Sequence, residues 1–434
     1  MRERITRAFR KSLRSPSARH LLTLSSSNLI AQVITILGIP ILSRVYGPTA
    51  FGFLAIYVSA ATLVSLVATG RYEYAILLPK SRNNALALKS LARRLLWLVA
   101  ILLEISMLVF LDSFAHFLDA TEYKYWLLTL PLHVVLLGEI SILSLWHTRH
   151  NGFSTLGRYR IIFSASTVVF QAVAGWLMLR DVRGLIIGLL VAQLIALVYL
   201  LSQQGISSIE RKGISGQRVL VALRRYKKMP LLNAPTALLD GIRNTGINLV
   251  IGGQSQQALG QYSMAWRSVQ APVGLVGSAL NQVYFQRMSH QDRGRLFSIV
   301  LSTTTRVALF TLPIFIVIFL LCPWFLPILL GESWADAGRY AQALVPWLFV
   351  NLVTSPIASV FVVTGTQGRQ AIFGVAYTLA PILMLSMLRD DLLFAVWCTS
   401  ILMAALLVGL LVLALFAARA DDRRYLAGAA NLKG

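Results

Sequence analysis

The chain has 434 residues, of which 56% are hydrophobic and only 13% are charged, and its formal net charge is +23. A soluble domain carries roughly 25% charged residues, so this composition excludes an ordinary soluble protein. The positive charge raises nucleic acid as a partner, but the basic residues lie in short segments beside apolar runs, without an aromatic-basic patch. Orientation in the membrane and anionic lipid headgroups explain the charge, and we expect no nucleic-acid partner.

Apolar segments long enough to cross a bilayer recur along the whole chain, since a helix needs roughly 20 apolar residues to cross about 30 Å of hydrocarbon. The twelve segments are 21–43, 51–69, 95–111, 125–146, 161–179, 184–201, 231–251, 262–284, 299–321, 339–363, 370–388 and 392–418. The sequence therefore predicts an all-α integral membrane protein with twelve transmembrane helices in two six-helix bundles.

Lys and Arg alternate between the segments that connect these spans. The connections on one side hold most of them, and those on the other side hold only Arg44, Lys124, Arg180, Arg183 and Arg389. The positive-inside rule then predicts a multi-pass protein with both termini in the cytoplasm. Residues 1–20 are strongly basic, but the apolar run after them is too long for a secretory signal.

The first span carries a polar stripe in which Asn28 and Gln32 are four residues apart. Such a stripe suits hydrogen bonds to sugar hydroxyls and interhelical hydrogen bonds equally well. At the cytoplasmic end of the second span, Arg71 and Glu73 form either an anchor at the membrane interface or part of a substrate-binding site. Glu139 in the fourth span could couple transport to proton entry, or could be buried as a neutral acid.

The longest polar connection lies at the middle of the chain. We expect an N-terminal bundle at 1–201, a cytoplasmic basic linker at 202–230 and a C-terminal bundle at 231–434. Ala50-Phe51-Gly52 opens the second span and Ala258-Leu259-Gly260 opens the eighth, which is a faint internal repeat. Two halves of six spans have the same orientation and would be related by an axis along the membrane normal.

Charges inside the apolar segments of the second half are the main functional signal, since a charge at the bilayer centre costs ~2.5–3.5 kcal/mol. In the seventh span Asp240 and Arg243 share one helical face, either as a local ion pair or as a ligand site. In the eighth span Arg267 heads a polar stripe that favours a cavity lining. Arg306 begins the ninth span and could also reach the inner interface.

No catalytic constellation is present in the sequence. It contains no G-x-x-x-x-G-K-[ST] loop for nucleotide, no serine elbow and no Asp-rich metal motif. Cys322 and Cys398 indicate two buried thiols, and no Cys/His spacing suggests a metal. The longest outer connection, 322–338, is too short for a periplasmic catalytic domain. We therefore expect a protein that is not an enzyme and has no cofactor or metal.

Several motifs resemble those of Wzx-type O-antigen and exopolysaccharide flippases, a family of the MOP superfamily that also includes MATE exporters and the lipid II flippase. The matching stretches are Leu42-Ser43-Arg44-Val45-Tyr46-Gly47-Pro48, Arg71-Tyr72-Glu73-Tyr74, Arg225-Tyr226-Lys227-Lys228-Met229-Pro230, Gln261-Tyr262-Ser263-Met264-Ala265-Trp266-Arg267 and Gly331-Glu332-Ser333-Trp334. They occur in both halves. Twelve spans fit the Wzx type better than the lipid II flippase, which has two more.

This resemblance implies a central cationic cavity that carries an undecaprenyl-diphosphate-linked oligosaccharide from the cytoplasmic to the periplasmic leaflet of the bacterial inner membrane by alternating access. A proton or sodium gradient would drive it, and polysaccharide polymerase machinery would be a partner beside the bilayer. Guanidinium groups suit the diphosphate because they give bidentate hydrogen bonds to phosphate oxygens.

The substrate-binding residues expected from these patterns are Arg243, Arg267, Arg71, Glu73, Arg306, Arg44, Asn28, Gln32, Gln270 and Asn281, with Asp240 and Glu139 as coupling acids. Arg44 lies at the outer end of the first span and could be an exit-side contact. Two rival functions are open. A MATE-like multidrug or cation exporter would need a cavity dominated by acids, and a glycan polymerase or ligase would need a large outer loop.

Overall fold

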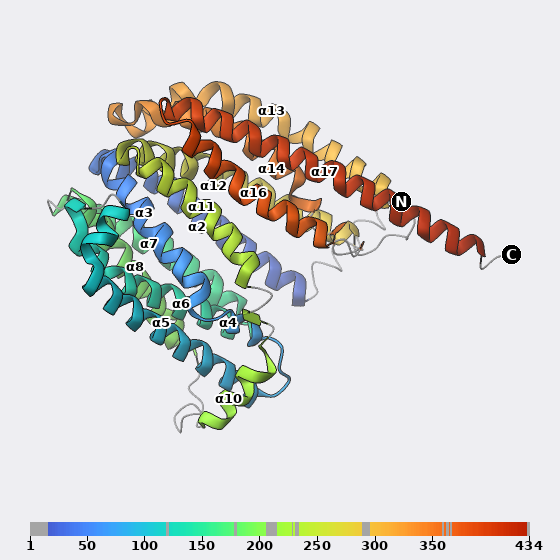
Figure 1. The fold of residues 1–434 in the computed structure, drawn as a ribbon, viewed down its shortest axis with the longest axis horizontal. Coiled ribbons are helices and arrows are strands. Elements are labelled where there is room, and N and C mark those ends of the chain that lie inside the picture. Colours follow the sequence, from blue (N-terminus) through green and yellow to red (C-terminus); the bar gives the residue numbers. More distant parts are fainter. Residues whose placement is uncertain are drawn as a thin grey trace. The chain divides into compact units, whose positions relative to one another are not determined.

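The computed structural model describes residues 16–118, 121–177, 180–204, 215–227, 229–230, 234–288, 296–357, 360–361, 364 and 367–431 (Figure 1). Every element within these ranges is a helix. The long helices are α2 (Pro16–Val45), α3 (Pro48–Ala68), α5 (Arg82–Phe117), α6 (Leu130–Arg149), α7 (Phe153–Trp176), α8 (Val182–Ser202), α11 (Ala234–Gly252), α12 (Gln256–Met288), α13 (Leu296–Leu330), α14 (Ala335–Thr354), α16 (Gln367–Met387) and α17 (Leu392–Asn431). Short helices are α4 (Tyr72–Ala75), η1 (Thr121–Thr129), α10 (Gly216–Arg225), η3 (Glu332–Trp334) and η4 (Ser355–Ile357).

Each predicted apolar segment falls largely in its own long helix. Seven stretches of the described chain are long and apolar enough to cross a membrane by length and composition: Leu24–Val45, Pro48–Ala68, Arg82–Phe117, Thr121–Arg149, Val182–Ser202, Leu296–Leu330 and Leu392–Arg423. The helices outside this set include α11 and α12, which carry Arg243 and Arg267. Such helices must turn their charged face toward protein or a cavity, because the charge is costly in lipid.

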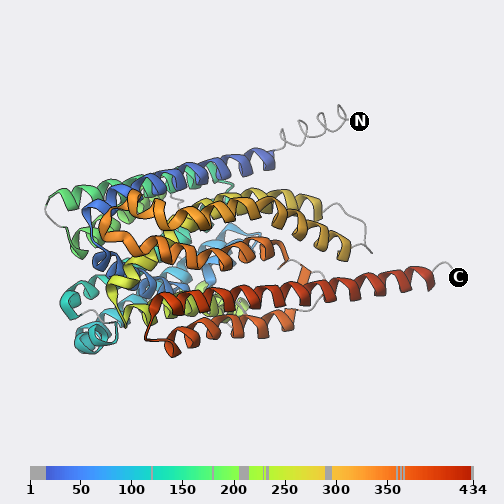
Figure 2. The same cartoon turned by 90° about the horizontal axis from the view of Figure 1, so that it is seen from above.

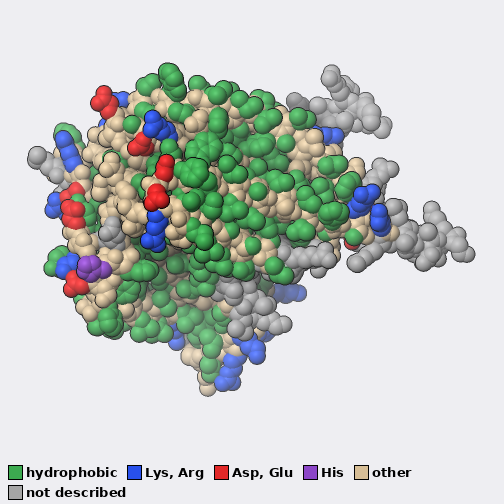
Figure 3. All heavy atoms as spheres, turned by 45° about the horizontal axis from the view of Figure 1, so that its top comes forward, with side chains coloured by type: hydrophobic (Ala, Val, Ile, Leu, Met, Phe, Trp, Pro, Cys, Tyr) green, Lys and Arg blue, Asp and Glu red, His purple; other side chains and the backbone are tan. Residues whose placement is uncertain are grey.

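Large hydrophobic side chains cover much of the molecular surface, as a membrane protein requires. Figure 3 shows a face on which hydrophobic side chains predominate and charged side chains are few. On α5, Leu108 and Val109 are 63% and 65% exposed, and on α13 Leu309 and Phe310 are 66% and 67% exposed. Exposure on this scale would be a liability in water but suits contact with lipid chains. The predicted all-α integral membrane class is confirmed.

The helices form two compact units, Met1–Gly241 and Ile242–Gly434. In the first, α6 contacts α3, α5 and α8, and α7 packs between α2 and α8. In the second, α14 contacts α12, α13 and α17, and α16 packs on α17. Within each unit the long helices run roughly alongside one another (Figures 1 and 2). The described part of the expected linker 202–230 belongs to the first unit, where α10 packs on α5.

Several helix contacts repeat between the two units. The pairs α5–α6, α3–α6, α6–α8 and α7–α8 of the first unit correspond, six long helices later, to α13–α14, α12–α14, α14–α17 and α16–α17 of the second. A stacked ring pair occupies the same interface in both. Tyr57 stacks on His133 with 5.1 Å between ring centroids, and Trp266 stacks on Trp347 with 5.0 Å. The faint sequence repeat thus corresponds to a repeated helix arrangement centred on α6 and α14.

Close helix packing in the second unit depends on Gly338. A Cβ atom at this position would lie 2.6 Å from the carbonyl oxygen of Cys322 and 2.8 Å from Cα of Pro323. Both obstacles are backbone atoms of α13, which cannot rotate away. The absence of a side chain therefore allows α14 to approach α13.

We predict that Gly338→Ala destabilises the protein by about 1–3 kcal/mol, the usual cost of overpacking. Gly409→Ala in α17 is the matched control, because a Cβ there meets nothing within 4 Å. It should be neutral or stabilising, since Ala favours a helix over Gly by about 1 kcal/mol. Thermal unfolding of the purified protein in detergent would measure both. Equal melting temperatures for the two variants would contradict the packing role of Gly338.

Candidate functional site

Arg71 and Glu73 lie together at the turn that follows α3. Gly70 and Arg71 both have left-handed backbones, with φ of 59° and 58°. This conformation costs a non-glycine residue roughly 1–2 kcal/mol, so the turn is held by its contacts. The Arg71 guanidinium lies 5.1 Å from the ring centroid of Tyr74 and 3.7 Å from Oε1 of Glu73. The predicted Arg71–Glu73 pairing is therefore present.

The carboxylate of Glu73 is almost fully enclosed. The residue is 3% exposed and accepts a hydrogen bond from the hydroxyl of Thr69. Burial is the largest influence on this group and raises the pKa of Glu73 above its ordinary value of 4.5, although Thr69 and Arg71 act in the opposite direction. The hydroxyl of Tyr72 also donates to the carbonyl of Leu223 at 3.4 Å, which links this turn to α10.

Glu139 has a partner that the sequence did not indicate. Nε of Arg93 donates to Oε1 of Glu139 at 2.7 Å, and Nη2 donates to Oε2 at 2.8 Å. This is a bidentate ion pair between α5 and α6, and its carboxylate is 8% exposed. Arg93 lies three turns inside α5, which begins at Arg82. The coupling role of Glu139 stays a prediction.

The polar stripe of α2 makes one clear contact. Oδ1 of Asn28 accepts a hydrogen bond from Nη1 of Arg160 on α7 at 3.0 Å. Oε1 of Gln32 is buried and has no hydrogen-bond partner among the described residues. An acceptor in this state is costly unless a ligand or water reaches it. Asn28 therefore forms an interhelical hydrogen bond between α2 and α7. Gln32 has an acceptor, and Arg160 has donors, that suit a polar ligand.

Arg243 lies against aromatic side chains within the second unit. Its guanidinium is 4.8 Å from the ring centroid of Tyr377 on α16. The Tyr377 hydroxyl accepts a hydrogen bond from Nε1 of Trp347 at 2.6 Å, and Trp347 stacks on Trp266. Arg267 follows Trp266 on α12 and is partly buried. The cation–π contact and the hydrogen-bonded rings hold Arg243 in one orientation.

Among the remaining predicted residues that the structure describes, Arg44, Arg306 and Gln270 form no hydrogen bond or ion pair with one another. Arg44, Arg306, Gln270 and Asp240 are exposed, and the side chain of Asn281 lies outside the described residues. Sequence reasoning missed Arg93, Arg160, Trp347 and Tyr377. The Trp266-Arg267 dipeptide was the one signal that pointed to an aromatic setting for the arginines. Among the described residues, no group of three or more His, Cys, Asp or Glu could hold a metal.

We predict that Arg93→Gln destabilises the protein by about 1–3 kcal/mol or more, because it leaves the Glu139 carboxylate buried without its bidentate donor. Adding Glu139→Gln should recover much of the loss, since the two neutral amides can hydrogen-bond to each other. Thermal unfolding of the single and double variants forms a double-mutant cycle. Strictly additive effects would show that the pair contributes no coupling.

The raised pKa of Glu73 predicts how the stability of the protein depends on pH. Because its folded-state pKa is raised, the folded chain binds a proton more readily than the unfolded chain, so this group's stabilising contribution falls as pH rises from about 4.5 through the folded-state pKa. The melting temperature of the native protein should therefore fall relative to that of Glu73→Gln as pH rises through this window, from about 4.5 to the folded-state pKa. Thr69→Val removes a hydrogen bond to the ionised form and should move the window to higher pH. Parallel curves for native protein and Glu73→Gln would contradict the raised pKa.

Known proteins share this architecture. The family model described as "Polysaccharide biosynthesis protein" matches residues 41–339. The solved structure of the lipid II flippase MurJ in its inward closed conformation has a TM-score of 0.72 and 11% identity, covering 92% of this chain and 90% of that one.

MATE-family multidrug transporters of the MOP superfamily are also similar. An inward-facing structure has a TM-score of 0.62 and 14% identity, covering 91% of this chain and 98% of that one. An outward-facing structure has a TM-score of 0.58 and 14% identity, covering 95% of this chain and 97% of that one. No curated protein matches the chain. At these identities the solved structures show the fold alone, while the family model covers more than half of the chain. The predicted family is thereby confirmed, and the chain belongs to the polysaccharide biosynthesis protein family with the helical fold of the MOP superfamily.

Proposed function

We propose that the protein is a flippase and not an enzyme. It carries an undecaprenyl-diphosphate-linked oligosaccharide, an O-antigen or exopolysaccharide repeat unit, from the cytoplasmic to the periplasmic leaflet of a bacterial inner membrane. Its fold is shared with a lipid flippase, and its family is described by polysaccharide biosynthesis. Transport proceeds by alternating access with both termini in the cytoplasm, and the lipid tail stays in the bilayer while the headgroup crosses.

The observation that carries this proposal is the setting of Arg243 on α11. A guanidinium 4.8 Å from a tyrosine ring, within a hydrogen-bonded set of aromatic side chains, is a preorganised cation in a helix bundle. A diphosphate must leave water to cross the membrane, and an oriented guanidinium replaces that water with two parallel hydrogen bonds. Arg267 supplies a second cation on α12. Two guanidiniums match the two phosphate groups of the carrier lipid.

Arg71 and Glu73 serve the cytoplasmic entrance in this proposal. The Arg71–Glu73 distance of 3.7 Å is longer than a direct charge-assisted hydrogen bond, so an incoming phosphate competes well for the guanidinium. The hydroxyl and amide groups of α2, with Gln32 foremost, would take sugar hydroxyls. A proton or sodium gradient drives the cycle, with Asp240 or Glu139 as the coupling acid. Polysaccharide polymerase machinery would receive the flipped unit.

A MATE-like cation exporter is the second candidate, because MATE transporters have the same fold. An organic cation needs accessible carboxylates. Glu139 is instead bound in a bidentate pair with Arg93, and Glu73 is enclosed by its own turn. Transport of a labelled organic cation by proteoliposomes, without lipid-linked sugar, would reverse our preference.

We predict that Arg267→Ala and Arg243→Ala each stop export of lipid-linked units while the protein still inserts in the membrane. Lys substitutions should rescue only partly, because an ammonium cannot form the bidentate contact. Surface glycan in a deletion strain carrying each variant measures export, and immunoblotting of membranes measures insertion. Arg389→Ala is the control, because Arg389 is exposed and contacts the carbonyl of its neighbour Ser386. Normal export by Arg267→Ala would remove that residue from the site.

Deletion of the gene provides a direct test of the substrate class. We expect a lipid-linked oligosaccharide to accumulate on the inner leaflet, where chemical analysis would identify its sugars. Accumulation of flipped but unpolymerised units on the outer leaflet would instead favour a polymerase or ligase. A drug exporter would leave the amount of lipid-linked oligosaccharide the same in the deletion strain as in the parent strain. That result would contradict the flippase proposal.

A further inference from the structure

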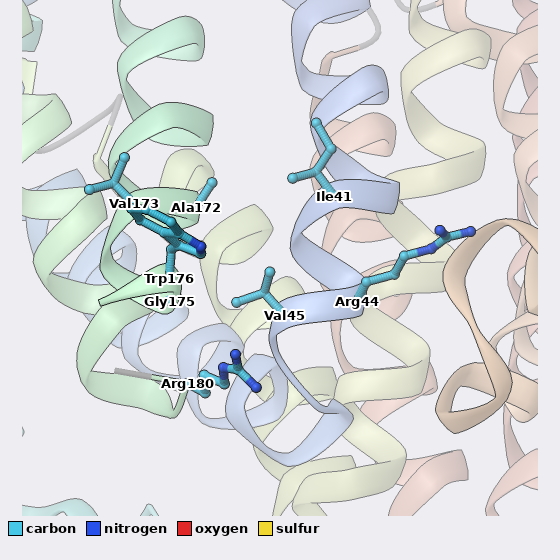
Figure 4. A pocket seen from close by; sticks show the side chains of 8 residues that line it. All are labelled: Ile41, Arg44, Val45, Ala172, Val173, Gly175, Trp176 and Arg180. Carbon is cyan, nitrogen blue, oxygen red and sulfur yellow. The ribbon is translucent and has the colours of Figure 1, made fainter. Parts of the chain in front are cut away.

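A cavity of about 460 Å³ opens between the ends of α2 and α7, within the first unit. It is lined by Ile41, Arg44, Val45, Ala172, Val173, Gly175, Trp176 and Arg180 (Figure 4). This volume lies within the ~300–1,000 Å³ typical of small-molecule sites. The lining combines an apolar wall with two arginines, Arg180 and Arg44, although the Arg44 guanidinium is directed away from the opening. An apolar wall beside basic side chains is the chemical character of a site for an amphipathic anion.

Close packing and hydrogen bonds hold together the helices that line the cavity. Gly175 allows α2 to approach α7, because a Cβ there would lie 2.2 Å from Cγ1 of Val45. The Tyr46 hydroxyl donates to the carbonyl of Gln171 at 2.7 Å, and Nε2 of Gln171 donates to the carbonyl of Leu185 at 3.0 Å. Burial, with a smaller effect of Asp181, raises the pKa of Tyr46 to about 12, so this hydroxyl remains a donor. These bonds join the residue that follows α2 to α7, and α7 to α8.

The charges at the cavity rim stand out against the rest of this side of the protein. Only five Lys and Arg residues lie in the connections of the expected outer side, and Arg44 and Arg180 are two of them. Both are exposed, and neither forms an ion pair with a described residue. The nearby carboxylate of Asp181 is taken by Arg183, whose Nε donates to Oδ2 at 2.7 Å.

Figure 4 shows how the rim groups lie. Arg180 lies near Val45 at one end of the opening, Trp176 projects from the facing helix, and the Arg44 guanidinium points away from the opening. Arg44 is exposed, so its long side chain can rotate toward a bound anion. Trp176 is 81% exposed, and an exposed Trp at a helix end is typical of headgroup depth in a membrane.

We propose that this cavity is an exit-side site that holds the diphosphate headgroup of the carrier lipid in the outer leaflet. The inference rests on the proposed flippase function and orientation. Arg180 binds the diphosphate first, and Arg44 rotates to complete the contact. The lipid chain lies along the apolar wall formed by Ile41 and Val173. Two guanidiniums match a diphosphate better than the single phosphodiester of an ordinary phospholipid, because the diphosphate carries more negative charge.

The test uses the full chain in phosphatidylcholine nanodiscs, with bound lipid measured by native mass spectrometry. The background carries Arg243→Ala and Arg267→Ala, which removes the proposed transport site. Undecaprenyl diphosphate is the probe, undecaprenol tests the need for charge, and phosphatidylglycerol tests competition by an ordinary anionic lipid. Arg180→Gln should weaken retention of the diphosphate by about tenfold, and Arg44→Gln with Arg180→Gln should abolish it. Arg389→Gln, which removes an equal charge outside the cavity lining, should have no effect.

Each outcome distinguishes this inference from the function on which it rests. Unchanged retention by the Arg44→Gln, Arg180→Gln variant would overturn the exit-side site. Equal retention of undecaprenol, or displacement by phosphatidylglycerol at equal mole fraction, would overturn the assignment to the diphosphate headgroup. Loss of all binding in the background variant alone would support the transport site and overturn this one. Retention that depends on Arg180, together with a native protein that exports no glycan in the deletion strain, would instead support the cavity while contradicting the flippase.

Discussion

A guanidinium inside a helix bundle that faces lipid must find a partner in the protein, because the hydrocarbon offers none. The described arginines meet this constraint in different ways. Arg93 is bound at 2.7–2.8 Å by the buried carboxylate of Glu139, and Arg243 lies over the ring of Tyr377. Arg71 is held at a strained left-handed turn beside Glu73. The partner of each guanidinium also determines which face of its helix is turned toward the protein. The charges thereby orient the helices that carry them.

These partners suggest different roles for residues of the same type. A bidentate pair with a buried carboxylate is strong and geometrically specific, which suits Arg93 to joining α5 and α6. A cation–π contact contributes about 0.5–2 kcal/mol, which positions a guanidinium and is readily exchanged for a phosphate. The 3.7 Å contact of Arg71 is likewise exchangeable. The distinction between structural and ligand-binding arginines therefore depends on the partner of each guanidinium.

The repeated arrangement of the two units gives these contacts a shared framework. In both, one central helix contacts at least three other long helices and carries a ring that stacks on a ring of the second span of its half. The stacked side chains differ, with Tyr57 and His133 in the first unit and Trp266 and Trp347 in the second. Arg243 and Arg267, the arginines proposed for the diphosphate, are in the second unit, whereas Arg71 and the cavity proposed as an exit-side site are in the first. A similar helix arrangement thus carries different side chains in the two units.

The sequence by itself determined the helical membrane class, the positions of the long helices and the family. Hydropathy reports these directly, since every span must satisfy the same bilayer thickness, and the motifs are local. It also identified Arg71 with Glu73, because two residues so close in a turn have little choice of partner. Only the tertiary structure paired Arg93 with Glu139, 46 residues apart, and Arg160 with Asn28, 132 residues apart. It alone placed Tyr377 beneath Arg243 and opened a cavity beside Arg180. A long arginine side chain can reach several neighbouring helices, and which of them lies within hydrogen-bond distance is decided by how the helices pack.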